Sequence, residues 1–107
     1  MRAVVAVYPA LALTVALCAA TPQAQAQDPL LARNLAATCA GCHGTNGQAP
    51  STIKPLAGMP ADRLLALLAD FRSGAQPATV MHQIAKGYSD EQIRLIAAYY
   101  AAQPAAK

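Results

Sequence analysis

The sequence has few aromatic residues and few charges. Of its 107 residues none is Trp, one is Phe and four are Tyr, and only 12% are charged, with a formal net charge of +3. Nucleic-acid-binding chains carry basic runs with interleaved aromatic side chains. This chain has neither, so we expect no nucleic-acid partner. It also has no alternating apolar and polar stretch of useful length, which predicts an all-α fold.

The N-terminal segment has the composition of a cleaved secretion signal. Arg2 precedes a nearly unbroken apolar run, and Ala24-Gln25-Ala26 forms an A-x-A cleavage site. A retained membrane anchor and lipidation at Cys18 are the alternatives. We expect residues 1–26 to be removed, which leaves a single periplasmic domain over residues 27–107 with no stable membrane span.

Cysteine is scarce, and with the signal removed only Cys39 and Cys42 remain, so no disulfide framework is available. Both belong to Cys39-Ala-Gly-Cys-His43, the attachment signature of a c-type haem. Residues three apart lie on one face of a helix, so both thiols can reach the two vinyl groups of one porphyrin. His43 lies about 100° further round the helix and can bring its imidazole under the iron. The motif predicts one covalently bound haem c.

Three other interpretations explain the motif less well. Structural zinc usually takes two spaced pairs of ligands, which disfavours a site made of these three residues and His82. A thioredoxin-like redox pair requires a βαβ context, and no strand pattern lies nearby. A simple disulfide between Cys39 and Cys42 would leave His43 without a role.

An iron held by His43 has a second axial position, for which Met59, Met81, His82 or no residue are the possibilities. Met81 follows a proline-containing loop and precedes the C-terminal helix, where a chain that wraps the porphyrin would reach its far face. Met59 directly precedes Pro60, and methionine there can simply fill a gap in the core. We expect Met81 to be the ligand.

Capping residues and apolar spacing predict the helices. We expect a first helix from Asp28-Pro29 into the haem motif, a second from Pro60 to Ser73, a short third over 79–86, and a last one that begins after the capping box of Ser89 and Gln92.

Residues 48–58 contain two prolines and are predicted to form a loop. A metal-bound histidine usually donates its second ring N–H to a fixed acceptor. A backbone carbonyl near Pro50 or Pro55 is a candidate acceptor for His43, and the sequence does not choose between them.

Several stretches together resemble a known family. They are Cys39-Ala-Gly-Cys-His-Gly-Thr-Asn-Gly47, Leu56-Ala-Gly58, Thr79-Val-Met81, Ile84-Ala-Lys-Gly-Tyr-Ser-Asp-Glu91 and Ala97-Ala-Tyr-Tyr100. Over essentially the whole mature chain they are similar to the small monohaem c-type cytochromes. The resemblance is strongest to the haem subunit of flavocytochrome c sulfide dehydrogenase, and extends to single domains of the dihaem cytochromes c4.

The resemblance implies a small cytochrome c fold of three to four helices around one haem c, with Met81 as the distal ligand. It implies an electron-transfer chain that is not itself an enzyme. Its partners would be an FAD-containing flavoprotein that oxidises sulfide and other cytochromes that accept electrons. A free-standing soluble carrier, and a haem enzyme or gas sensor with an open iron, are the alternatives. The weakly charged stretches 48–51 and 75–80 are candidates for a partner-facing rim.

Overall fold

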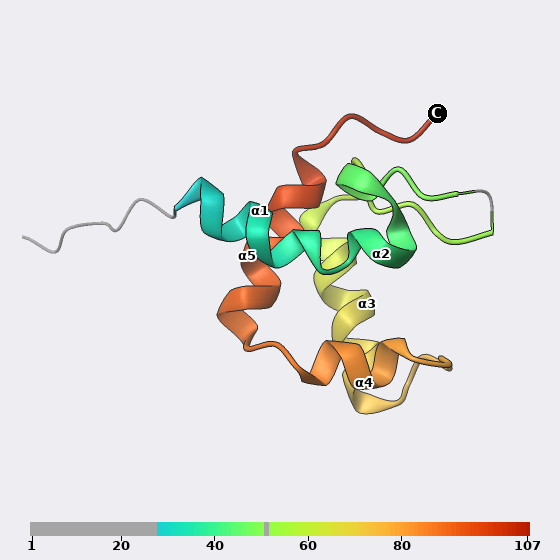
Figure 1. The fold of residues 1–107 in the computed structure, drawn as a ribbon. Coiled ribbons are helices and arrows are strands. Elements are labelled where there is room, and N and C mark those ends of the chain that lie inside the picture. The colour runs from blue at the N-terminus through green and yellow to red at the C-terminus, as the bar shows by residue number, and fades with distance from the viewer. Residues whose placement is uncertain (1–27, 51) are drawn as a thin grey trace, which may run out of the picture.

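The structure, a computed structural model, describes residues 28–50 and 52–107 (Figure 1). It contains five α-helices and a 3₁₀ helix, and no strand occurs in the described residues, which confirms the all-α prediction. The elements are α1 (Pro29–Ala37), α2 (Ala40–His43), η1 (Thr45–Gly47), α3 (Ala61–Ser73), α4 (Met81–Lys86) and α5 (Asp90–Ala101).

The helices pack in pairs around one core. α1 crosses α5, and α3 packs against both α5 and α4 (Figure 1). Within the part of the chain that the structure describes, no helix is both long and apolar enough to cross a bilayer. The expected signal peptide, residues 1–26, lies outside the described residues.

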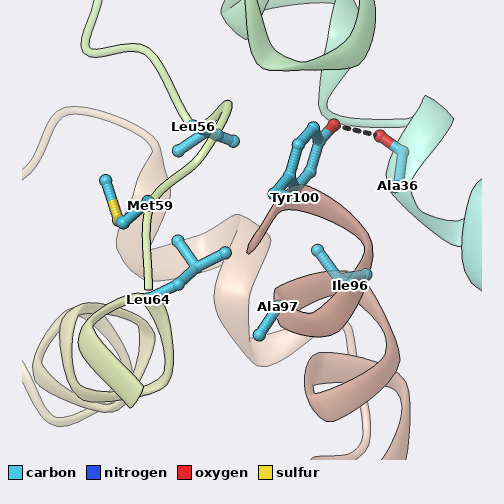
Figure 2. Packing of buried hydrophobic residues seen from close by; sticks show 7 residues of the cluster. All are labelled: Ala36, Leu56, Met59, Leu64, Ile96, Ala97 and Tyr100. Carbon is cyan, nitrogen blue, oxygen red and sulfur yellow. Dashed lines mark hydrogen bonds between the residues drawn. The ribbon is translucent and has the colours of Figure 1, made fainter. Parts of the chain in front are cut away.

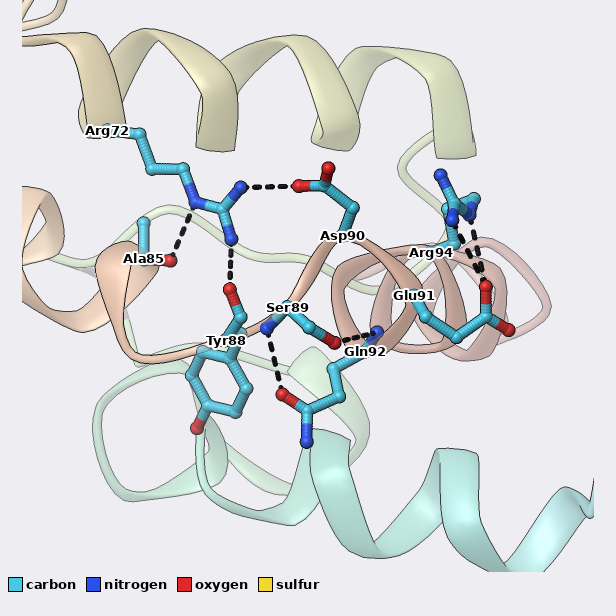
Figure 3. Close-up of polar contacts among 8 residues, drawn as sticks. All are labelled: Arg72, Ala85, Tyr88, Ser89, Asp90, Glu91, Gln92 and Arg94. Carbon is cyan, nitrogen blue, oxygen red and sulfur yellow. Dashed lines mark hydrogen bonds and ion pairs between the residues drawn. The ribbon is translucent and has the colours of Figure 1, made fainter.

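The predicted capping residues begin their helices as expected. The Asp28 carboxylate accepts a hydrogen bond from the Leu30 N–H at 2.9 Å, and Pro29 occupies the first turn of α1. At α5 the Ser89 hydroxyl accepts from the Gln92 N–H, and the Gln92 side chain accepts from the Ser89 N–H (Figure 3). Both arrangements satisfy backbone donors that have no partner inside the helix.

The first helix does not continue into the haem motif, and this part of the prediction is wrong. α1 ends at Ala37. The next two N–H groups, those of Thr38 and Cys39, donate to carbonyls three residues back rather than four, which makes this turn tighter than an α-helix. The Thr38 hydroxyl also donates to the Leu35 carbonyl at 2.8 Å. Such back-bonding by threonine bends helices, so α2 starts as a separate short element.

The third predicted helix is shorter than expected. α4 begins at Met81 because the preceding residue, Val80, has a non-helical φ of −133°. α4 therefore contains six residues rather than the eight of the range 79–86.

Tyr100 lies at the centre of the core and is 1% exposed (Figure 2). Its hydroxyl donates to the Ala36 carbonyl at 2.6 Å and joins α5 to α1, while its own carbonyl accepts from the Gly58 N–H at 2.9 Å. The other buried residues of this cluster are Ala36, Leu56, Met59, Leu64, Ile96 and Ala97. Within α5 the buried residues are Ile93, Leu95, Ile96, Ala97 and Tyr100.

Gly47 turns the chain between the haem motif and the following loop. Its carbonyl accepts hydrogen bonds from the Leu56 and Ala57 N–H groups at 3.0 and 3.2 Å. Its φ is +78°, and a Cβ there would lie 2.6 Å from the Ala57 nitrogen and 2.9 Å from Tyr100 Cδ1. Only glycine satisfies both the backbone angle and this close approach.

We predict that Gly47→Ala lowers the free energy of unfolding more than Gly74→Ala does. Both glycines have positive φ, but a Cβ at Gly74 would meet nothing within 4 Å. Gly74→Ala therefore carries only the left-handed backbone cost of about 1–2 kcal/mol. Gly47→Ala adds a steric clash with backbone, so its total should exceed that range. Urea unfolding of the haem-bound variants measures both, and equal losses would contradict this account of Gly47.

Candidate haem-attachment site

The three residues of the attachment motif lie on a single turn of chain. Cys39 is the residue before α2, and Cys42 and His43 end it. The Cys42 and His43 N–H groups both bond the Cys39 carbonyl, at 3.3 and 2.9 Å, so the turn is closed on itself. No disulfide joins Cys39 and Cys42, so both sulfurs are available for attachment.

The two thiols have different surroundings. Cys39 is half-buried and packs against the core cluster, whereas Cys42 is exposed. Burial raises the pKa of the Cys39 thiol above its ordinary value of 9.0, an effect that the nearby Thr38 hydroxyl partly offsets. Before attachment, the Cys39 thiol is therefore harder to ionise than an exposed thiol.

The His43 ring is oriented by the loop. Its Nδ1 lies 2.7 Å from the Lys54 carbonyl oxygen. A carbonyl can only accept, so Nδ1 carries a proton, and in the neutral ring Nε2 then keeps its lone pair. A histidine that binds metal through one nitrogen is usually held this way through the other. Of the two regions that the sequence left open, the structure selects the carbonyl directly before Pro55.

The candidate second ligands have three different environments. Met59 is 8% exposed and packs in the core beside Leu56 and Leu64 (Figure 2). Met81 is half-buried at the first position of α4. His82 lines an open cavity of about 270 Å³ with Phe71 and Lys86, and its Nδ1 is buried with no hydrogen-bond partner among the described residues.

The residues present fit a haem better than a bare metal ion. Large apolar side chains are exposed beside the ligand candidates: Ile53 precedes Lys54, Val80 precedes Met81, and Ile84 lies one turn along α4. An apolar macrocycle is the kind of group that would bury such side chains. In residues 28–50 and 52–107, no three His, Cys, Asp or Glu side chains gather as a metal cluster, so the zinc interpretation gains no support.

Two tyrosines attach the motif to α5 and its preceding turn, and neither contact was predicted from the sequence. The Tyr99 hydroxyl donates to the Asn46 side-chain oxygen of η1. The Tyr88 hydroxyl is hydrogen-bonded to the hydroxyl of Thr38, the residue before Cys39. The one available signal was composition: in a chain with so few aromatic residues, each tyrosine is a candidate for a specific role.

The sequence also matches known proteins. Residues 26–99 match the family described as cytochrome C oxidase, cbb3-type, subunit III. The chain is 44% identical over 66 residues to the cytochrome subunit of sulfide dehydrogenase from Chlorobaculum tepidum, covering 62% of this chain and 60% of that protein. It is 43% identical over 70 residues to cytochrome c-554(548) from Halomonas halodenitrificans, covering 62% of this chain and 84% of that protein.

A third relative, the thiosulfate dehydrogenase electron acceptor from Stutzerimonas stutzeri, is 42% identical over 72 residues, which are 65% of this chain and 33% of that protein. The expected haem c and the resemblance to small c-type cytochromes are confirmed. The relatives are named as a cytochrome subunit, a cytochrome and an electron acceptor. The chain therefore belongs to the family of c-type cytochromes matched over residues 26–99.

Proposed function

We propose that this chain is a periplasmic electron-transfer protein with His43 and Met81 as the axial ligands of one haem c. Cys39 and Cys42 form the two thioether bonds to the porphyrin. The electrons come from a sulfide-oxidising, FAD-containing dehydrogenase subunit and leave to another cytochrome.

The observation that carries the proposal is the hydrogen bond from His43 Nδ1 to the Lys54 carbonyl. It puts a proton on the nitrogen that faces the loop, so in the neutral ring Nε2 carries the lone pair, which is the form that binds iron. It also holds the ring without help from a cofactor, because both partners belong to the chain. A histidine that served only the core would not need this arrangement on a half-exposed turn.

Burial favours Met81 over Met59 as the second ligand. Met59 is enclosed by apolar side chains of the core, so its sulfur packs there as a core-filling group. Met81 is half-buried, and its neighbours Val80 and Ile84 are 53% and 42% exposed, which makes this segment an uncovered apolar surface. The site also resembles the family in which a methionine at this position is the distal ligand.

These residues determine what the site does. When bound, haem c supplies one-electron cycling between ferric and ferrous iron. A thioether ligand such as that of Met81 raises the reduction potential relative to a second histidine. With His43 and Met81 both on the iron, no axial position is left for a substrate, so the chain transfers electrons and leaves the oxidation chemistry to its partner.

Two relatives and the exposed rim of this chain support a dehydrogenase subunit as the partner. One relative is named as a subunit of sulfide dehydrogenase and another as the electron acceptor of thiosulfate dehydrogenase. Of the proposed rim, residues 75–80 are all exposed and uncharged, and Gln48 and Pro50 are exposed as well. Position 51 lies outside the described residues. A weakly charged rim of this kind suits a lasting interface better than long-range steering.

A free-standing carrier is the second candidate. It is favoured by the match to cytochrome c-554(548), because this chain covers 84% of that protein. A single-domain cytochrome of this size would meet its partners through small, transient interfaces.

The first prediction from the proposed function concerns haem attachment. Cys39→Ala should leave one thioether and the double variant with Cys42→Ala should leave none, because each vinyl addition needs a thiol. Haem staining of denaturing gels, on protein matured in a host that assembles c-type cytochromes, measures this. Covalent haem in the double variant would contradict the assignment.

The second prediction concerns ligation. Met81→Ala should abolish the near-infrared sulfur-to-iron charge-transfer band of the oxidised protein and lower the reduction potential, since a thioether leaves the iron. Met59→Leu is the matched control and should do neither, because Met59 only fills the core. Loss of the band in the control with its survival in Met81→Ala would assign the ligand to the other methionine.

The third prediction separates the permanent partner from the transient one. At about 0.5 M salt exposed charge pairs are largely screened. A complex with a flavoprotein subunit that buries an apolar rim should survive gel filtration at that salt concentration. Association only in dilute buffer would favour the free-standing carrier. Rapid carbon monoxide binding to the reduced wild-type protein, without a preceding ligand-dissociation step, would favour an open iron instead.

A further inference from the structure

The helix that carries Met81 is too short to be stable alone. α4 has six residues, its first turn has no side-chain cap, and isolated helices of this length do not persist in water. Its packing partner among the helices is α3. Whatever holds α4 in place therefore also decides where the Met81 sulfur lies.

Arg72, near the end of α3, holds the C-terminal end of α4 (Figure 3). Its Nε donates to the Ala85 carbonyl at 3.0 Å, and one terminal nitrogen donates to the Tyr88 carbonyl in the turn that follows. The other terminal nitrogen lies 2.6 Å from the Asp90 carboxylate at the start of α5. The carbonyls at a helix C-terminus have no partner inside the helix, and the helix dipole favours a cation there. The Arg72 guanidinium supplies both a hydrogen-bond donor and a positive charge at this end of α4.

The two carbonyl contacts matter more than the ion pair. The Asp90 side chain is 77% exposed, and exposed ion pairs contribute little. Both carbonyl bonds are partly buried, and the Arg72 side chain is only 28% exposed. Buried hydrogen bonds to a charged group are among the stronger ones.

Tyr88 continues the connection to the other side of the site. Its carbonyl accepts from Arg72, and its hydroxyl bonds the Thr38 hydroxyl next to Cys39. Three residues thus link the end of α4 to the attachment turn through the protein alone. We name the set Arg72, Tyr88 and Thr38 the strap.

We propose that the strap positions Met81 on the iron by fixing α4 relative to the attachment turn. The inference rests on the proposed ligation by Met81. His43 is tied to the haem by the neighbouring thioethers, whereas a methionine sulfur is held only by its own bond and by the placement of α4. Loosening the strap should therefore release the methionine before the fold is lost.

The test compares Arg72→Gln with Arg94→Gln in the haem-bound protein. Each variant removes one positive charge, but within the described part of the chain Arg94 bonds only Glu91, on the surface of α5 (Figure 3). Carbon monoxide reaches the reduced iron only after Met81 leaves it, so its binding rate reports how often the methionine is off. We expect Arg72→Gln to bind carbon monoxide about tenfold faster or more, with unchanged far-ultraviolet circular dichroism. Arg94→Gln should stay within about twofold of the wild type.

Tyr88→Phe tests the strap without touching the Arg72 contacts. It removes one hydroxyl bond and should raise the rate by about threefold. Arg72→Lys keeps the charge but loses the planar fork, and should also bind carbon monoxide faster than the wild type. If Arg72→Gln does not accumulate as folded protein, these two variants decide the question.

Wild-type rates in Arg72→Gln, or in both Arg72→Lys and Tyr88→Phe, would overturn the strap. Met81→Ala is measured alongside and should bind carbon monoxide fastest of all and lack the charge-transfer band. If Met81→Ala behaves as the wild type, the ligation itself is wrong. If only the strap variants behave as the wild type, the ligation stands and the positioning role fails.

Discussion

The buried ring of Tyr100 is the constraint on which the arrangement of the site depends. Its hydroxyl ties α5 to the Ala36 carbonyl of α1, its carbonyl holds Gly58, and its ring contacts the turn at Gly47. These contacts bring the helix before the attachment motif and the loop after it onto the same end of α5 (Figure 2). The loop then returns the Lys54 carbonyl to within 2.7 Å of His43 Nδ1, so the acceptor for the proposed iron ligand belongs to a loop that the core holds.

The two proposed axial ligands differ in how the protein secures them. His43 is held three times, by the closed turn of α2, by the Lys54 carbonyl and by the thioethers proposed at Cys39 and Cys42. Met81 depends on a six-residue helix held against α3 and capped by Arg72. A protein that must keep a thioether on iron through both redox states needs α4 and Met81 to be held as rigidly as His43.

Local sequence signals predicted the parts of the structure that local chemistry determines. The caps at Asp28 and Ser89 and the haem motif follow from residues close together in the chain. The break at Thr38 was missed because apolar periodicity continues through it, while the hydroxyl bond to Leu35 that bends the helix does not show in the pattern. The Lys54 acceptor and the contacts of Arg72 join residues 11 to 18 positions apart, so they depend on tertiary packing.

The central claim is that one methionine sulfur completes the coordination of a histidine-bound haem iron. Iron K-edge X-ray absorption of the oxidised wild-type protein tests it most directly, because sulfur scatters differently from nitrogen and oxygen. The account predicts one sulfur in the coordination shell beside the porphyrin and imidazole nitrogens, and its loss in Met81→Ala. A shell of nitrogen and oxygen alone in the wild-type protein would contradict it.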